Sequence, residues 1–138
     1  MNIEVRYLSK SGNTKKIADA IAGELGITAK SITQAVPTDT DILFLGGAVY
    51  WGGIDGELKK FIATLGGKVK KIAVFSTAAL APSAYPQMRK LITAQNVTVL
   101  EREFHCRGEF MKVHNGRPDA KDLRLAGQFA RETVKNSV

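Results

Sequence analysis

Cysteine is nearly absent from this chain, since Cys106 is the only one among 138 residues. A single cysteine excludes an internal disulfide and any metal site that needs several thiolates. Long apolar runs are also missing, because no stretch approaches the roughly 20 residues that a membrane-spanning helix requires. The first eight residues have the pattern of a strand and lack the basic and apolar regions of a signal peptide. We therefore expect a cytoplasmic protein without a membrane span.

Acidic residues are fewer than basic ones, 13 against 20, which gives a net charge of +7. The basic residues are spread along the chain without a helix-turn-helix, zinc-finger or aromatic RNA-binding signature. We expect a solvated basic surface and no specific nucleic-acid binding.

Catalytic and metal-binding signatures are also missing. Neither His105 nor His114 has a Cys, Asp or Glu at useful ligand spacing, so we expect surface or loop histidines and no metal site. Cys106 lacks the arginine of a Cys-x5-Arg phosphatase loop, because position 112 is lysine. No nucleophile elbow is present. We expect a buried, inert thiol at Cys106 and no catalytic side chain.

Strand-like and helix-like segments alternate along the chain. Apolar patterns predict five strands, at residues 3–8, 27–32, 41–46, 70–76 and 97–104. Helical spacing predicts helices over residues 14–25, 54–65 and 83–95 and from residue 118 onward. This alternation predicts a single α/β domain over residues 1–138, a three-layer, doubly wound, five-stranded parallel sheet in the order 2-1-3-4-5. Residues 33–40 are too few for a full helix, and residues 105–117 form the longest irregular piece.

The most informative stretch lies between the first strand and the first helix. Its residues are Ser9, Lys10, Ser11, Gly12, Asn13 and Thr14. A helix that starts there presents unpaired backbone N–H groups and the positive end of its dipole, both of which suit a phosphate. An ordinary helix cap is the alternative, since Ser, Thr and Asn are the usual N-cap residues.

This Ser-x-Ser-Gly-Asn-Thr pattern resembles the FMN-phosphate loop of flavodoxins. The topology expected for the whole chain agrees with that resemblance. It implies that FMN binds at the carboxyl ends of the strands, where the strand order reverses. The segment 104–108 also looks like that of some short flavodoxin-family proteins.

A second loop is expected after the third strand, at Gly46–Gly53. It resembles the second flavin-contacting loop of flavodoxins, and its candidate contacts are Ala48, Val49, Tyr50, Trp51 and Gly52. Aromatic side chains there would stack on a flat ligand. A hydrophobic lid formed by Tyr50 and Trp51 is the alternative.

A third loop follows the fourth strand, with Ser76, Thr77 and Ala78 as candidate contacts. It resembles the third flavin loop by position alone. Flavodoxins often carry an aromatic and acidic residues here, whereas this chain has Ala79 and Leu80 and its nearest aromatic is Tyr85. A plain strand-to-helix connection is the alternative.

The resemblance implies an FMN-binding electron carrier rather than a turnover enzyme. An FMN-dependent oxidoreductase acting on NAD(P)H or a quinone remains an alternative, because the missing aromatic favours a more open ring site. A receiver domain is disfavoured, since the third strand ends in Gly46–Gly47 where the phospho-acceptor Asp should stand. Familiar flavodoxins are acidic and this chain is basic, so we expect an acidic redox partner protein.

Overall fold

The computed structural model describes residues 1–49, 53–78, 82–108 and 116–137. The strands are β1 (Ile3–Tyr7), β2 (Lys30–Ser31), β3 (Thr40–Ala48), β4 (Val69–Ala78), β5 (Thr98–Val99) and β6 (Phe104–Arg107). The helices are α1 (Asn13–Leu25), α2 (Gly56–Ile62), α3 (Tyr85–Thr93) and α4 (Ala120–Asn136).

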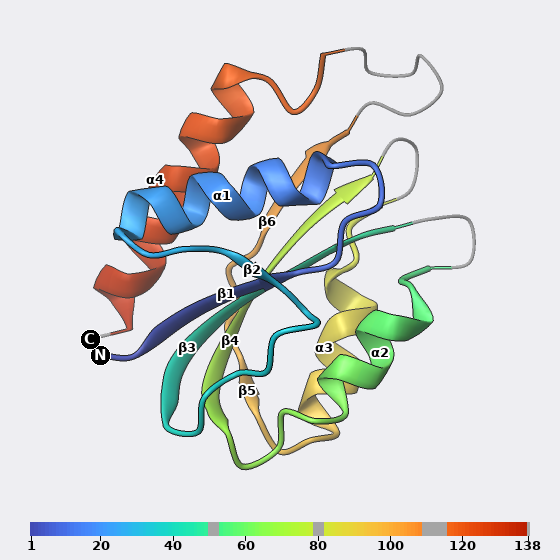
Figure 1. Cartoon of the computed structure of the whole chain (residues 1–138), viewed down its shortest axis with the longest axis vertical. Helices are drawn as coiled ribbons and strands as arrows, with labels where there is room; N and C mark the ends of the chain where they lie inside the picture. The colour runs from blue at the N-terminus through green and yellow to red at the C-terminus, as the bar shows by residue number, and fades with distance from the viewer. Residues whose placement is uncertain (50–52, 79–81, 109–115, 138) are drawn as a thin grey trace.

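All strand pairings are parallel, in the order β2-β1-β3-β4-β5, with β6 also paired to β4. Helices α1 and α4 cover one face of the sheet, and α2 and α3 cover the other (Figure 1). This arrangement confirms the three-layer, doubly wound fold and the order expected for its strands.

Alternating side chains of the central strands supply two separate apolar cores. Leu43 and Leu45 of β3 pack toward α2 and α3, whereas Ile42 and Phe44 pack toward α1 and α4. Because both faces of a parallel sheet are covered by helices, these strands are apolar at nearly every position. The ring of Phe44 meets Phe129 of α4 edge-on, with centroids 5.9 Å apart.

The last strand differs from the continuous strand expected over residues 97–104. Between the pairs Ile72–Val99 and Phe75–Phe104, β4 advances three residues while the neighbouring chain advances five. The four residues 100–103 lie opposite only two residues of β4, so the chain makes an excursion there and β5 and β6 are separate short strands. Residues 105–107, expected to be irregular, belong to β6.

Glycine also moves the end of β3 beyond the expected boundary at residue 46. Gly46 and Gly47 lie inside the strand and are buried. A Cβ at Gly46 would lie 2.0 Å from Cε2 of Phe75, and one at Gly47 would lie 2.5 Å from Cδ2 of Leu58. These glycines therefore allow side chains of the flanking elements to approach the sheet, and the following loop starts later than expected.

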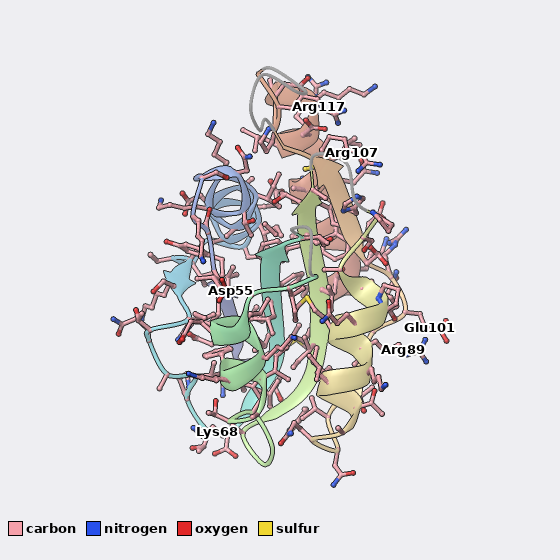
Figure 2. All side chains as sticks on the ribbon, turned by 90° about the vertical axis from the view of Figure 1, so that its right-hand side faces the viewer. Asp55, Lys68, Arg89, Glu101, Arg107 and Arg117 are labelled. Atoms are coloured by element: carbon pink, nitrogen blue, oxygen red, sulfur yellow. The ribbon has the colours of Figure 1, made fainter. Side chains whose placement is uncertain are left out.

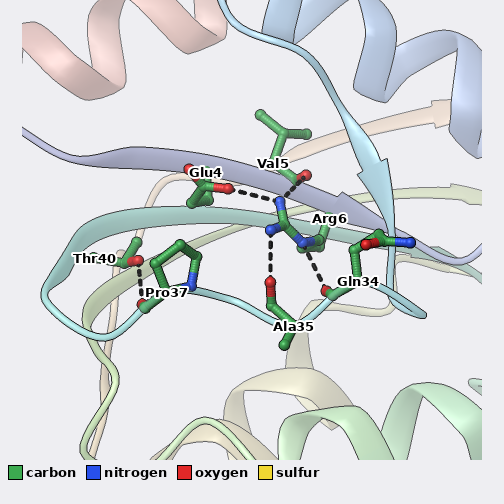
Figure 3. Close-up of polar contacts among 7 residues, drawn as sticks. All are labelled: Glu4, Val5, Arg6, Gln34, Ala35, Pro37 and Thr40. Carbon is green, nitrogen blue, oxygen red and sulfur yellow. Dashed lines mark hydrogen bonds and ion pairs between the residues drawn. The ribbon is translucent and has the colours of Figure 1, made fainter.

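The crossover between β2 and β3 contains no helix, as its length predicts, and a buried arginine holds it. Arg6 is 1 % exposed. Its guanidinium donates to the carbonyl oxygens of Gln34 and Ala35, both at 2.9 Å, and of Val5 at 3.1 Å (Figure 3). Glu4 pairs with the same guanidinium at 2.9 Å. Arg6 thus satisfies carbonyl groups that a helix would have bonded internally.

Candidate functional site

Several strand ends meet at the carboxyl edge of the sheet. The register pairs Tyr7 with Gly46, Ala48 with Thr77, and Ala78 with Arg107. The connections that follow β1, β3, β4 and β6 therefore start at one edge (Figure 1). The strand order reverses there between β1 and β3, which is where ligands bind in sheets of this kind.

The loop after β1 turns directly into α1. Ser9 Oγ accepts a hydrogen bond from the N–H of Gly12 at 3.0 Å. Gly12 is the N-cap residue with φ of 91°, a left-handed conformation that disfavours other residues. A Cβ at this position would meet nothing within 4 Å, so the space beside the loop is open.

The first turn of α1 suits a negative ligand. No side chain of the described residues caps this helix, and its first turn contains no acidic residue. A helix leaves its first N–H groups without partners inside the helix. Ser11 is exposed at the tip of the loop, so its hydroxyl lies at the surface beside those groups.

Thr14 faces inward rather than toward the surface. It is 1 % exposed, and its Oγ1 lies 2.9 Å from Oγ1 of Thr77 at the end of β4. A hydroxyl has one donor and two acceptor positions, so this bond leaves further capacity on both oxygens. The contact ties the start of α1 to the third predicted loop across the sheet.

Lysines flank the loop and form ion pairs. Lys10 Nζ lies 2.6 Å from Asp55 Oδ2, and Asp55 also caps α2 by accepting from the N–H of Glu57 at 2.8 Å. The hydrogen bond from Lys10, followed by that from Glu57, lowers the pKa of Asp55. Lys15 pairs with Asp19 one turn along α1, which raises the pKa of Lys15. The excess positive charge beside the loop is therefore smaller than the number of lysines suggests.

The second predicted loop begins at Ala48, the last residue of β3. Val49 continues the ladder by donating its N–H to the carbonyl of Thr77 at 3.0 Å. Both residues are partly exposed at the sheet edge. Tyr50, Trp51 and Gly52 lie outside the described residues, and their contact with a flavin stays a prediction.

The third predicted segment is buried. Ser76, Thr77 and Ala78 are 0 %, 2 % and 4 % exposed. The Ser76 hydroxyl lies 3.0 Å from Nδ1 of His105 and accepts from the N–H of Ala84 at 3.3 Å. Both hydroxyls of this segment are engaged inside the protein, and its carbonyls at Thr77 and Ala78 accept from the N–H groups of Val49 and Gly108, so the segment is internal to the sheet. Residues 79–81 lie outside the described residues.

The end of β6 adds a fourth connection at this edge. Gly108 donates its N–H to the carbonyl of Ala78 at 3.3 Å. A Cβ at Gly108 would lie 2.6 Å from Nδ2 of Asn13, so the glycine brings this strand against the start of α1. Cys106 is 6 % exposed, and burial raises the pKa of its thiol to about 12. The thiol therefore stays protonated and unreactive at neutral pH.

Comparison with known proteins agrees with this geometry. A family model described as "Flavodoxin domain" matches residues 5–132. The chain belongs to the flavodoxin family.

Individual relatives cover nearly the whole chain. An uncharacterized protein of Methanocaldococcus jannaschii, MJ0298, is 28 % identical over an alignment of 138 positions that covers 90 % of this chain and 91 % of that protein. A flavodoxin from the domain Archaea superposes with a TM-score of 0.79 at 18 % identity, covering 99 % of both chains. Oxidised Flavodoxin 2 from Bacillus cereus superposes with a TM-score of 0.72 at 18 % identity and the same coverage. At such identities the superpositions show the shared fold.

In this member of the flavodoxin family, several residues at the edge are ones that the sequence did not single out as functional. His105 was expected at the surface or in a loop, but it lies in β6, and its Nε2 is buried without a hydrogen-bond partner among the described residues. Ser83 and Glu103 form a hydrogen bond with each other beside it. Their positions 20 residues apart give no motif, and the excursion at 100–103 that brings Glu103 to Ser83 is visible in the strand register.

None of the helices in the described ranges combines the length and apolar composition that crossing a bilayer requires. His114 and Lys112 lie outside those ranges.

Proposed function

We propose that this flavodoxin-family protein binds FMN at the carboxyl edge of its sheet and carries electrons between redox partners. Bound FMN would supply the one- and two-electron chemistry, and the protein would supply binding, orientation and electrostatics. Membership of the family and the fold support this proposal. The residues proposed to hold the cofactor are those of the loop at 9–14, of the end of β3 and of the end of β4.

The proposal that the loop at 9–14 binds the phosphate of FMN rests on the start of α1. Its uncapped first turn, left-handed Gly12 and open space fit a doubly charged phosphate monoester, because N–H groups, hydroxyls and the helix dipole all favour an anion. An ordinary cap would have placed a side-chain oxygen on the first N–H groups. Among the described residues, the loop hydroxyl of Ser9 instead bonds Gly12 and shapes the loop.

The flavin ring is proposed to lie beside β3 and β4, with the aromatic pair Tyr50 and Trp51 against it. The buried Ser76 and Thr77 belong to the sheet beneath this part of the edge. A more open ring would favour the alternative, a reductase that uses NAD(P)H.

The experiment is a visible spectrum of the purified protein with added FMN, followed by NADH and NADPH. A bound-flavin band without steady pyridine-nucleotide oxidation supports the carrier. Steady oxidation supports the reductase, and the absence of any flavin band would contradict both. Riboflavin, which lacks the phosphate, is the matched control ligand and is expected to bind more weakly.

A further inference from the structure

A partly buried polar cluster lies beside the third predicted loop and is not used by the phosphate site. It contains Ser76 of β4, Ser83 just before α3, Glu103 of the excursion and His105 of β6. Ser83 donates to a carboxylate oxygen of Glu103. A second bond from α3 reaches the same excursion, since the hydroxyl of Tyr85 donates to the carbonyl of Leu100 at 2.9 Å.

With all three side-chain contacts of the cluster formed as hydrogen bonds, counting donors and acceptors gives their directions. An ionised Glu103 can only accept, so the Ser83 hydroxyl is the donor. Ser83 Oγ then accepts the N–H of Tyr85 at 3.0 Å and the hydroxyl of Ser76 at 3.4 Å. Ser76 Oγ accepts the N–H of Ala84 and a proton from His105 Nδ1. The bonds therefore run one way, from His105 through Ser76 and Ser83 to Glu103.

This assignment uses every lone pair of both serine hydroxyls and leaves one group without a partner. Within the part of the chain that the structure describes, His105 Nε2 is buried without a hydrogen bond, as a bare lone pair in this tautomer. Burial is the main reason that the pKa of His105 is lowered, with Arg107 lowering it further and Glu103 opposing. A buried polar group without a partner costs about 1–3 kcal/mol. An apolar cluster of the same volume would avoid that cost, so packing alone does not account for these residues.

The cluster fixes both ends of the connection between β4 and α3. Ser76 is the third residue from the end of β4, and its hydroxyl holds the N–H of Ala84 at the other end. Ser83 holds the N–H of Tyr85, the first residue of α3. Glu103 and His105 attach the two serines to the excursion and to β6. The connection between these ends is the segment to which the third flavin loop was assigned.

We propose that Ser76, Ser83, Glu103 and His105 are positioning residues for the flavin ring. They fix the direction in which the main chain leaves β4 and enters α3, and thereby the part of the sheet edge that meets the ring. This inference rests on the proposed binding of FMN. It differs from the phosphate assignment because it concerns the ring, which FMN and riboflavin share.

The test compares Ser83→Ala and Glu103→Leu with the wild-type protein, because each variant removes one partner of the Ser83–Glu103 hydrogen bond. We expect both variants to bind FMN and riboflavin more weakly by the same factor, up to about tenfold, as the loss of one hydrogen bond predicts. The absorption band of the bound flavin and its reduction potential should shift as well. Ser83→Thr keeps the hydroxyl and should restore all three properties.

Thr40→Val is the matched control. It removes a hydroxyl that donates to the carbonyl of Pro37 at 2.7 Å, at the opposite end of the sheet. Urea unfolding measures how much stability each variant loses. The proposal is overturned if Ser83→Ala keeps the wild-type flavin affinity, absorption spectrum and reduction potential. It is also overturned if Thr40→Val changes these three properties by the same amount.

A measurement without flavin separates this inference from the proposed function. Hydrogen exchange at the amides of Ala84 and Tyr85 should be faster in Ser83→Ala than in the wild-type protein, and unchanged exchange would overturn the positioning role. The wild-type FMN titration decides the proposed function. If the wild-type protein binds FMN and the variants behave like the wild type, the FMN proposal is supported and the positioning role is contradicted.

Discussion

At the scale of single residues, the hydroxyls of the first loop test the phosphate assignment. Ser11→Ala combined with Thr14→Ala removes two hydroxyls at the start of α1. Two hydrogen bonds worth about 1–2 kcal/mol each, between the values for neutral and charged partners, should weaken FMN binding by about 2–4 kcal/mol when they are lost. Riboflavin binding should change little, because riboflavin has no phosphate. Fluorescence titration of both flavins measures the difference.

Thr77→Val is the control for this double variant. It removes the partner of Thr14, whose Oγ1 lies 2.9 Å from that of Thr77, and leaves the loop intact. We expect the free energy of unfolding to fall by about 1 kcal/mol and the ratio of FMN to riboflavin affinity to stay constant. An equal loss for both flavins in the double variant would contradict the phosphate assignment.

These residues also show what a sequence can and cannot predict about the site. The loop at 9–14 is a local motif, and the fold places it at the carboxyl edge as its position between strand and helix predicts. The bond between Thr14 and Thr77 joins residues 63 positions apart. It depends on strand register, which no local pattern contains. The same reason explains why His105, Ser83 and Glu103 were not recognised as a cluster.

At the scale of secondary-structure elements, α4 begins with a capping box and an ion pair in which Asp122 is buried and Arg117 is partly exposed. Asp119 and Asp122 bond each other's backbone N–H groups, at 3.0 and 2.9 Å. The Arg117 guanidinium also donates two bonds to the Asp122 carboxylate, at 2.7 and 3.1 Å. The hydrogen bond from Arg117 is the main reason that the pKa of Asp122 is lowered.

We expect Asp122→Asn to destabilise the protein by about 1–3 kcal/mol at neutral pH, since Arg117 loses its charged partner. The pKa of Asp122 is lower in the folded protein than in the unfolded chain. Its stabilisation is therefore complete above the unfolded value near 4 and disappears as the pH falls through the folded value. Urea midpoints between about pH 7 and 3 should converge for wild type and variant at the acid end.

Asp39→Asn is the control for that series. Asp39 is exposed and has φ of 66°, a conformation that asparagine tolerates. We expect its midpoints to follow those of the wild type. A constant gap between Asp122→Asn and wild type down to the lowest pH would show that the charge is not the source of the stabilisation.

The crossover between β2 and β3 depends on Arg6. Arg6→Met fills similar space but leaves three buried or partly buried carbonyl groups without their donor. We expect a loss of about 2–4 kcal/mol in the free energy of unfolding and faster hydrogen exchange around residues 33–40. Arg102→Met is the control, because the Arg102 side chain is 52 % exposed and its pair with Glu132 lies at the surface. Equal losses in the two variants would contradict this role.

Elements were predictable where the pattern was strongly periodic. The apolar runs of β3 and β4 and the helical spacing of α1 and α4 suffice for the layers and their order. The split of the last strand was missed, although the three consecutive charged residues Glu101, Arg102 and Glu103 interrupt the apolar pattern at that place. Contacts from Tyr85 and Ser83 hold the excursion at 100–103 away from the ladder. The glycines of β3 were assigned to a loop because glycine usually weakens strands, whereas here Phe75 and Leu58 occupy the space of their missing side chains.

At the scale of the whole molecule, the net charge of +7 distinguishes this chain from acidic flavodoxins. Arg107 and Arg117 lie at the same end of the molecule in Figure 2, opposite Lys68. Lys10, Lys15 and Arg117 nevertheless form ion pairs with Asp55, Asp19 and Asp122. The excess charge therefore acts as a field over the surface rather than as one dense patch, and we expect such a field to steer an acidic partner during its approach.

The same field bears on the reduction potential of the proposed FMN. A positive charge about 10 Å from the ring, at an effective dielectric of about 40, favours the anionic reduced flavin by about 0.8 kcal/mol, or roughly 35 mV for one electron. We expect the couple that forms fully reduced FMN to be less negative than in acidic flavodoxins. Redox titration with FMN bound measures it, and raising the salt to about 1 M should make it more negative, because the screening length falls to about 3 Å. A potential as low as that of acidic flavodoxins, with no dependence on salt, would show that contacts at the ring outweigh the charge of the molecule.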